Sequence, residues 1–346
     1  MTDVHLVLPA AYDDPRRASG GNTYDRHLSA GLAELGWNVV RHEAPDVWPA
    51  PRAGVAAAVN RQLALIPADQ VVVVDGLIGA AAATALLRHA ARLRLVALVH
   101  MPGPPGGPPD AVLRAARLVV TTSHWTARNL VDEHGLPTRK LLVAPPGAPP
   151  AELATGTAAG TTLLCVAAVT EQKGHDVLFT ALAGLTSQPW TCVCVGALDR
   201  EPGLVRRLRR VLVDTGIADR VRLTGALAGT ELDRAYAASD VLVLPTRLES
   251  YGLVVTEALA RGLPVIATSV GGVPEALGHA ADGRRPGILV APGDMRALSA
   301  AISDWTGRAE VRDELRSAAL SRRARLRRWE QTVTTISIAL TRVATA

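Results

Sequence analysis

The stretch RLESYGLVVTEALARGLPVIAT, residues 247–268, carries the most informative pattern of the sequence. It holds two glutamates, Glu249 and Glu257, with Gly252 between them. The apolar run DVLVLP just before it predicts a buried strand, and a proline closes that run. A helix is then expected from near Gly252 to Gly262, because glycine is a common stop at a helix C-terminus. The stretch therefore predicts a strand, a turn and a helix, with one carboxylate in the turn and one in the helix.

A helix N-terminus that follows a parallel strand is suited to binding an anion. The backbone amides of Gly252, Leu253 and Val254 would be unpaired there, and the helix dipole favours negative charge. Glu257 lies about one turn further on, where a carboxylate can accept hydrogen bonds from a ribose diol. Glu249 can reach a group beyond the phosphate, so the pattern indicates a nucleotide diphosphate with a group attached. The alternative is that Glu249 caps the helix and Glu257 is a surface residue.

Outward from this stretch, apolar strand-like runs alternate with helical segments along the whole chain. Such alternation predicts an α/β fold in which parallel sheets are covered on both faces. The alternation is interrupted once, by the Pro- and Gly-rich residues 145–161, which read as a linker. We therefore expect two doubly wound, Rossmann-like domains that face each other across a cleft. Their bounds are 1–150 and 151–325, and residues 326–346 form a helix that crosses back to the first domain.

Composition and charge indicate a folded globular protein rather than a disordered one. The chain of 346 residues is 48% hydrophobic and 20% charged, which is typical of a soluble globular protein. Its net charge is +5, nearly all of the positive charge is arginine, and the dense arginine runs lie in helical-looking segments at 206–210 and 322–328. A solvated helix face is the simplest interpretation, and an acidic surface or anionic lipid is the alternative. No aromatic residues alternate with the arginines, so nucleic acid is not an expected partner.

The cysteines and the N-terminus point to a reducing compartment. Cys165, Cys192 and Cys194 lie in apolar strand-like runs, where buried and reduced thiols are expected. Cys192 and Cys194 share one face of a strand but lack the further neighbouring ligands of a zinc site, so no metal is expected. The stretch MTDVHLVLPA lacks the basic region of a signal peptide. We expect a cytoplasmic protein without a membrane span.

The carboxyl half resembles a known family. ASDVLVLPTRLESYGLVVTEALARGLPVIATSVGGVPEAL, followed by GILVAPGDMRALSAAI, is similar to the donor-binding half of retaining glycosyltransferases of family 4, which have the GT-B fold. The E-x7-E signature of that family corresponds to Glu249 and Glu257. The similarity is tight over residues 163–305. It is thinner in the amino half, where it depends on SGGNTYDRHLSAGLAELG, on His100 and on TTSHWTARNLVDEHGLPTRKLLVAPPG.

The resemblance implies transfer of a sugar from a nucleotide diphosphate sugar to a small hydroxyl-bearing acceptor. It implies retention at the anomeric carbon by front-face attack, with no metal and no other cofactor. The first domain would bind the acceptor and the second the donor, both small molecules. An oligomeric state is not implied.

The resemblance also assigns residues. The catalytic residues would be His100, Lys173 and Glu249. The donor would be bound by Gly20, Gly21, Lys173, Gly225, Glu249, Tyr251, Gly252, Leu253, Val254 and Glu257. The acceptor would be bound by Asp13, Asp14 and His100.

One departure from the family concerns the diphosphate. The family usually has an arginine five or six residues before the lysine, where this chain has Ala167 and Ala168. Arg247 or another arginine could replace it, or catalysis could be slow or altered. Two alternatives therefore stay open: an epimerase or pseudo-glycosyltransferase of the same fold, and a non-catalytic protein that binds nucleotide sugars. A simple NAD enzyme is disfavoured because no G-x-G-x-x-G follows the first strand.

Overall fold

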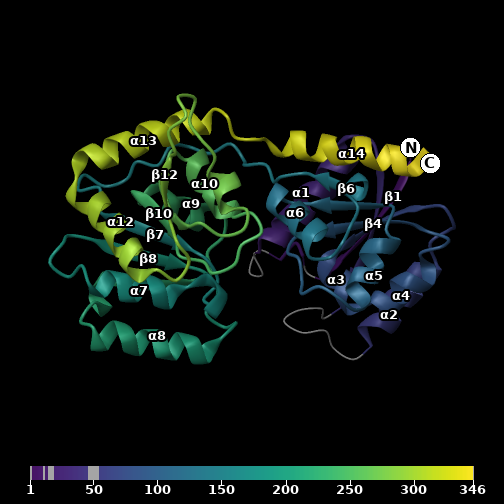
Figure 1. Cartoon of the computed structure of the whole chain (residues 1–346), viewed down its shortest axis with the longest axis horizontal. Helices are drawn as coiled ribbons and strands as arrows, with labels where there is room; N and C mark the ends of the chain where they lie inside the picture. The colour runs from purple at the N-terminus through teal and green to yellow at the C-terminus, as the bar shows by residue number, and fades with distance from the viewer. Residues whose placement is uncertain (1, 11, 15–18, 46–53, 346) are drawn as a thin grey trace. The chain divides into compact units, whose positions relative to one another are not determined.

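The chain divides into two compact units. The computed structural model describes residues 2–10, 12–14, 19–45 and 54–345. The first unit, called here the amino unit, comprises Met1–Gly147 and Arg327–Ala346, and the second, the carboxyl unit, comprises Ala148–Leu326. Figure 1 shows the elements of both.

The amino unit is built on a six-stranded parallel sheet in the order β2-β1-β3-β4-β5-β6. The strands are β1 (Asp3–Pro9), β2 (Asn38–Ala44), β3 (Val71–Asp75), β4 (Arg94–Val99), β5 (Leu118–Thr121) and β6 (Leu141–Val143). All five residues of β3 are buried, as expected for a parallel sheet that is covered on both faces. The strand order reverses between β1 and β3, where the carboxyl ends of the strands form a ligand site in folds of this kind.

The carboxyl unit has a second six-stranded parallel sheet in the order β12-β11-β10-β7-β8-β9. The strands are β7 (Thr162–Val166), β8 (Thr191–Val195), β9 (Val221–Gly225), β10 (Val241–Leu244), β11 (Val265–Thr268) and β12 (Gly287–Val290). Here the order reverses between β7 and β10. The loops that follow these two strands are therefore the ones that flank the expected ligand position.

Helices cover both faces of each sheet. The amino unit has α1 (Gly20–Glu34), α2 (Val55–Ala64), α3 (Gly76–Ala81), α4 (Ala83–His89), α5 (Pro108–Ala115), α6 (His124–Asp132) and α14 (Trp329–Thr345). The carboxyl unit has α7 (His175–Ala183), α8 (Pro202–Asp214), α9 (Gly229–Ala237), α10 (Leu253–Ala260), α11 (Val273–Leu277), α12 (Met295–Gly307) and α13 (Ala309–Arg323). In the carboxyl unit, α7, α8 and α12 share an apolar core with one face of the sheet, while α10 and α11 pack on the other.

The predicted fold class is confirmed, since both halves are doubly wound α/β units with parallel sheets. Some details differ. The segment from the end of β3 to Arg92, which the sequence pattern predicts to be a single helix, forms two helices, α3 and α4, because the backbone leaves the helical region at Ala82. The sequence gives no sign of this break, since alanine favours helices. The helices α2 and α5 were not expected, because each lies beside a run rich in proline or glycine. None of the helices described combines the length and apolar character that crossing a membrane requires.

The helix α14 belongs to the amino unit although it follows the carboxyl unit in sequence. The indole of Trp329 stacks on the ring of His27 with centroids 4.2 Å apart and lies edge-on to Tyr24. Further along the helix, Ser337 Oγ accepts a hydrogen bond of 2.8 Å from the Trp37 indole. These contacts bind α14 to α1 and to the residue that precedes β2.

A buried carboxylate fixes the start of the carboxyl unit. Asp240, 1% exposed, accepts hydrogen bonds from the backbone amides of Thr157 and Thr162, both 2.8 Å long. It also accepts one from the Thr157 hydroxyl and pairs with Arg316 at 3.0 Å. The carboxylate therefore joins the segment before β7 to the residue before β10 and to α13.

Replacing this carboxylate should destabilise the carboxyl unit. We expect Asp240→Ala to lower the free energy of unfolding by about 2–4 kcal/mol, because two backbone amides and the half-exposed Arg316 lose a buried partner. Denaturant unfolding followed by circular dichroism measures the change. Asp304→Ala is the matched control, because it removes an exposed carboxylate paired with Arg308 at 3.7 Å and should cost less than about 1 kcal/mol. Equal effects of the two variants would refute the role given to Asp240.

Candidate functional site

Two predicted site residues meet at the carboxyl ends of β7 and β10. Lys173 ends the short helical turn Glu171–Lys173 after β7, and Glu249 lies in the loop after β10. The ammonium nitrogen of Lys173 is 2.6 Å from Oε2 of Glu249. The side chains are 24% and 15% exposed, so a ligand can reach the pair while its charges are only partly screened by water.

Gly174 determines where Lys173 lies. Its φ is +70°, and a Cβ there would be 2.1 Å from the carbonyl oxygen of Pro245, at the end of β10. No other residue fits so close an approach of two backbones. The loops are also joined by a hydrogen bond of 2.8 Å from the Arg247 amide to the Gln172 carbonyl. The position of Lys173 beside Glu249 is therefore fixed by backbone contacts.

The helix α10 begins where the sequence pattern predicts. Gly252, with φ +95°, precedes its first residue, Leu253, and Val254 follows. Tyr251 is buried and Leu253 and Val254 are half-buried. No side chain caps α10, so the interpretation of Glu249 as a helix cap is wrong. The helix N-terminus thus lies directly after the loop that carries Glu249.

Glu257 is half-buried on α10 and has a partner that sequence reasoning missed. Tyr236, near the end of α9, donates a hydrogen bond of 2.8 Å to Glu257 Oε2. Burial raises the pKa of Glu257, while this hydrogen bond and the charge of Arg261 oppose the rise. The alternative of an unbound surface glutamate is therefore wrong. No motif marks Tyr236, which lies in an otherwise ordinary amphipathic helix.

The arginine considered as a replacement for the missing cation is held elsewhere. The guanidinium of Arg247 forms two hydrogen bonds with the Asp176 carboxylate, of 2.8 and 2.6 Å. It also donates to the Glu171 carbonyl at 2.6 Å. At the position of the family's arginine, the backbone of Ala167 continues the sheet through a bond to Val195. Lys173 is thus the predicted diphosphate cation that these loops present.

In the amino unit, His100 follows β4 and is held by two carboxylates. Its Nε2 is 3.0 Å from Oδ1 of Asp25, on α1, and 3.2 Å from Oδ2 of Asp75, at the end of β3. Burial alone would lower the pKa of His100, but the two carboxylates outweigh it and raise the pKa to about 10. Burial raises the pKa of Asp25 to about 6, and the charge of His100 opposes that rise. At neutral pH the imidazole is therefore protonated.

The other predicted residues of the amino unit lie near the start of α1 or in the turn after β1. A Cβ on Gly21 would be 3.1 Å from the ring of His100, so the glycine permits their close approach. Gly20 is the first residue of α1, which Ser19 caps. Asp13 is exposed and Asp14 is half-buried in the turn after β1. Neighbouring residues 15–18 of the expected loop are outside the described part of the chain.

Gly225 is the predicted donor residue that lies furthest from these loops along the carboxyl sheet. It ends β9 with φ +81°, and its carbonyl accepts a hydrogen bond of 2.9 Å from the Gly196 amide. The structure thus brings some predicted residues together in three groups: the Lys173 and Glu249 pair beside α10, Glu257 with the unpredicted Tyr236, and His100 with Gly21. Gly225, Asp13 and Asp14 lie outside these groups.

The charge of His100 can be tested directly. Asp75→Asn keeps an oxygen that can accept the hydrogen bond from the Leu77 amide at the start of α3 but removes one negative charge from the imidazole. We expect the pKa of His100 to fall by about 1–3 units, measured by NMR titration of the ring protons. Asp110→Asn is the control, because that carboxylate pairs with a different histidine, His134. An unchanged pKa in Asp75→Asn would contradict the assignment.

Comparison with known proteins identifies the family. The family described as glycosyl transferases group 1 matches residues 160–307. D-inositol 3-phosphate glycosyltransferase of Geodermatophilus obscurus is 34% identical over 256 residues, which are 69% of this chain and 55% of that protein. The match therefore spans about half the length of this relative. GDP-mannose-dependent alpha-(1-6)-phosphatidylinositol monomannoside mannosyltransferase of Mycobacterium tuberculosis is 31% identical over 305 residues, which are 78% of this chain and 71% of that protein.

Solved structures share the fold at low sequence identity. Sucrose-phosphate synthase from Thermosynechococcus elongatus superposes with a TM-score of 0.78 at 21% identity, over 99% of each chain. HepE from Anabaena, in complex with UDP and glucose, has a TM-score of 0.75 at 17% identity and matches 99% of this chain and 100% of its own. The sequence relatives and the fold agree, and this chain belongs to the glycosyl transferases group 1 family.

Proposed function

We propose that the chain is a retaining glycosyltransferase of family 4. It transfers a sugar from a UDP- or GDP-sugar to a small hydroxyl-bearing acceptor, by front-face attack and without a metal. The observation that carries this proposal is the ion pair of Lys173 and Glu249 beside the start of α10. A cation, a carboxylate and a helix N-terminus together can bind a diphosphate and the sugar attached to it. Free, buried cysteines are in keeping with the cytoplasm.

In the carboxyl unit each group has a separate role in this proposal. The ammonium of Lys173 stabilises the charge that develops on the leaving diphosphate, which is where electrostatic stabilisation lowers the barrier most. Glu249 accepts a hydrogen bond from a hydroxyl of the donor sugar. Glu257 accepts hydrogen bonds from the ribose, and Tyr236 holds its carboxylate in position.

In the amino unit His100 is the proposed contact to a substrate hydroxyl. Both described contacts of its ring to carboxylates are at Nε2, so Nδ1 is the nitrogen that can donate to a ligand. One sequence relative is named for D-inositol 3-phosphate and another for a phosphatidylinositol monomannoside. A polyol of the inositol class is therefore the first acceptor to test.

A second candidate is a related enzyme or a binding protein. The observation that favours it is the pair Ala167 and Ala168, together with the engagement of Arg247 by Asp176. An epimerase would convert the donor without any acceptor, and a binding protein would bind the donor without turnover. Incubation with donor alone, followed by chromatography of the sugar nucleotide, identifies an epimerase. Incubation with donor and candidate acceptors then distinguishes a binding protein, which gives no transfer product, from a glycosyltransferase.

The donor base should be identified first. We expect one of UDP, GDP and ADP, tested without metal, to raise the melting temperature by mass action, since a ligand that binds only the folded state stabilises it. Isothermal calorimetry then gives the affinity for that nucleotide and its sugar conjugates. The absence of stabilisation by any nucleotide or conjugate would count against a nucleotide-sugar site.

Substitutions of the two site residues should affect different quantities, the turnover for Lys173 and the nucleotide affinity for Glu257. We expect Lys173→Ala to lower kcat by about 10²–10³-fold, because the leaving group loses its stabilising charge. We expect Glu257→Ala to weaken nucleotide binding by about 10–100-fold, because hydrogen bonds to a charged group are lost. Lys140→Ala is the matched control, since Lys140 is the other lysine of the chain and lies in the amino unit. If both site variants kept the kinetics of Lys140→Ala, the site assignment would be wrong.

A further inference from the structure

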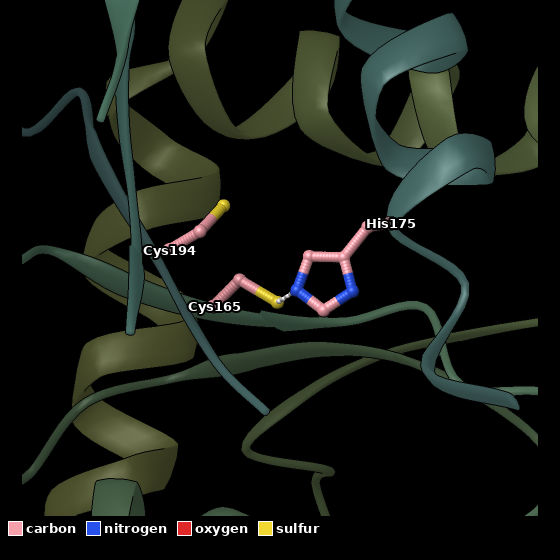
Figure 2. A group of neighbouring side chains, drawn as sticks. All are labelled: Cys165, His175 and Cys194. Carbon is pink, nitrogen blue, oxygen red and sulfur yellow. Dashed lines mark hydrogen bonds between the residues drawn. The ribbon is translucent and has the colours of Figure 1, made fainter. Parts of the chain in front are cut away.

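Two cysteines and a histidine meet in the core of the carboxyl unit. Cys165 on β7 and Cys194 on β8 lie opposite each other in the parallel pairing, and His175 is the first residue of α7. All three side chains are buried, and the thiols are free. The sulfur atoms and a ring nitrogen lie within 4.8 Å of one another. Figure 2 shows the three side chains.

The histidine of this group lacks a strong polar partner. Its Nε2 is 3.8 Å from Sγ of Cys165, and the Cys165 sulfur points toward the ring (Figure 2). Its Nδ1 has no hydrogen-bond partner among the residues that the structure describes. A sulfur contact of this length is weak, and burial of an imidazole without a good partner is unfavourable. The nitrogen that faces the sulfur, Nε2, therefore has only this weak contact, and a cation bound there would be a stronger partner for it.

We propose that Cys165, Cys194 and His175 bind one thiophilic cation of the zinc(II) or copper(I) class. Thiolate sulfur and imidazole nitrogen are the ligands that these ions prefer, and neither ion imposes a strict geometry. With metal–ligand bonds of about 2.0–2.3 Å, neighbouring ligand atoms are about 3.5–3.8 Å apart. The 3.8 Å between Cys165 Sγ and His175 Nε2 matches this spacing. The three ligand atoms lie within 4.8 Å of one another, so the group would have to contract by up to about 1 Å around the ion.

The backbone holds the three ligands in place. The two strands are paired in the sheet, and Gly174 places the start of α7 against the end of β10. A bound cation would connect β7, β8 and α7. Its histidine ligand, His175, lies two residues after Lys173 in the sequence. Sequence reasoning considered Cys192 and Cys194 alone, because strand pairing and the return of the loop are needed to bring Cys165 and His175 together.

The binding reaction is an exchange of protons for the metal ion. Each thiol that becomes a ligand releases its proton to solvent, so the apparent affinity should fall as the pH is lowered. The proposal does not depend on the proposed transferase activity, and the site takes no part in that chemistry.

Cadmium(II) is the probe for this site. The full chain is reduced, and bound metal is removed with a chelator. The protein is then incubated with Cd²⁺ overnight, because buried ligands are reached slowly, and is separated from free metal. We expect one Cd²⁺ per chain and an ultraviolet absorption from thiolate-to-cadmium charge transfer. Cys165→Ser and Cys194→Ser should each lower the retained Cd²⁺ by at least about tenfold.

Cys192→Ser is the matched control. Its sulfur is 3.8 Å from that of Cys194, on the same strand, but it is outside the group of three ligand atoms. We expect this variant to retain Cd²⁺ as the wild type does. A wild type without the absorption band would overturn the proposal, and so would an equal loss of Cd²⁺ in Cys192→Ser and Cys165→Ser.

A measurement on the wild type covers the case in which a serine variant fails to fold. Zinc is loaded in the same way, and X-ray absorption at the zinc edge counts the neighbouring atoms. We expect two sulfur atoms and at least one nitrogen around the zinc. A shell of oxygen and nitrogen alone would refute the site.

Discussion

The close approach of Gly174 to Pro245 is the constraint on which the chemistry of the carboxyl unit depends. With φ +70° and no side chain, this glycine lets the loop after β7 lie against the end of β10. Lys173, on one side of it, then reaches Glu249, and His175, on the other side, enters the core next to Cys165. One backbone contact thus positions both the lysine of the proposed donor-binding pair and the histidine of the proposed cation site. A Cβ at this position would have to separate the two loops, because the atom in its way is a backbone oxygen.

The two units prepare their polar groups for a ligand in different ways. In the carboxyl unit, Lys173 and Glu249 neutralise each other and remain partly exposed, so a bound diphosphate would replace one anionic partner by another. In the amino unit, His100 is held between Asp25 and Asp75, which keep the imidazole charged despite its burial. In both cases the desolvation of the charged groups is already offset within the protein, and little of it is left for a ligand to overcome.

The fold, and the strand, loop and helix that carry the proposed carboxyl-unit site, could be predicted from the sequence because their signals are local. Alternating apolar runs predicted the two parallel sheets, and the apolar run before Gly252, with the stop at Gly262, located α10. The partners of the predicted residues could not be found in this way. Asp25 is 75 residues from His100, and no local pattern connects them. The hydrogen bond from Tyr236 to Glu257 and the contact of Cys165 with His175 both depend on how helices pack on the sheet. A single sequence does not specify that packing.

The place of α14 has a consequence for how the protein is made. Its contacts with Trp37 and His27 complete the amino unit, yet the ribosome synthesises it only after all of the carboxyl unit. The carboxyl unit can therefore fold during translation as a continuous segment, whereas the amino unit must wait with the surface of α1 uncovered. Until α14 arrives, Val333 is missing from its contact with Gly31, and the side of α1 that carries Tyr24, His27 and Gly31 lacks the helix that packs on it.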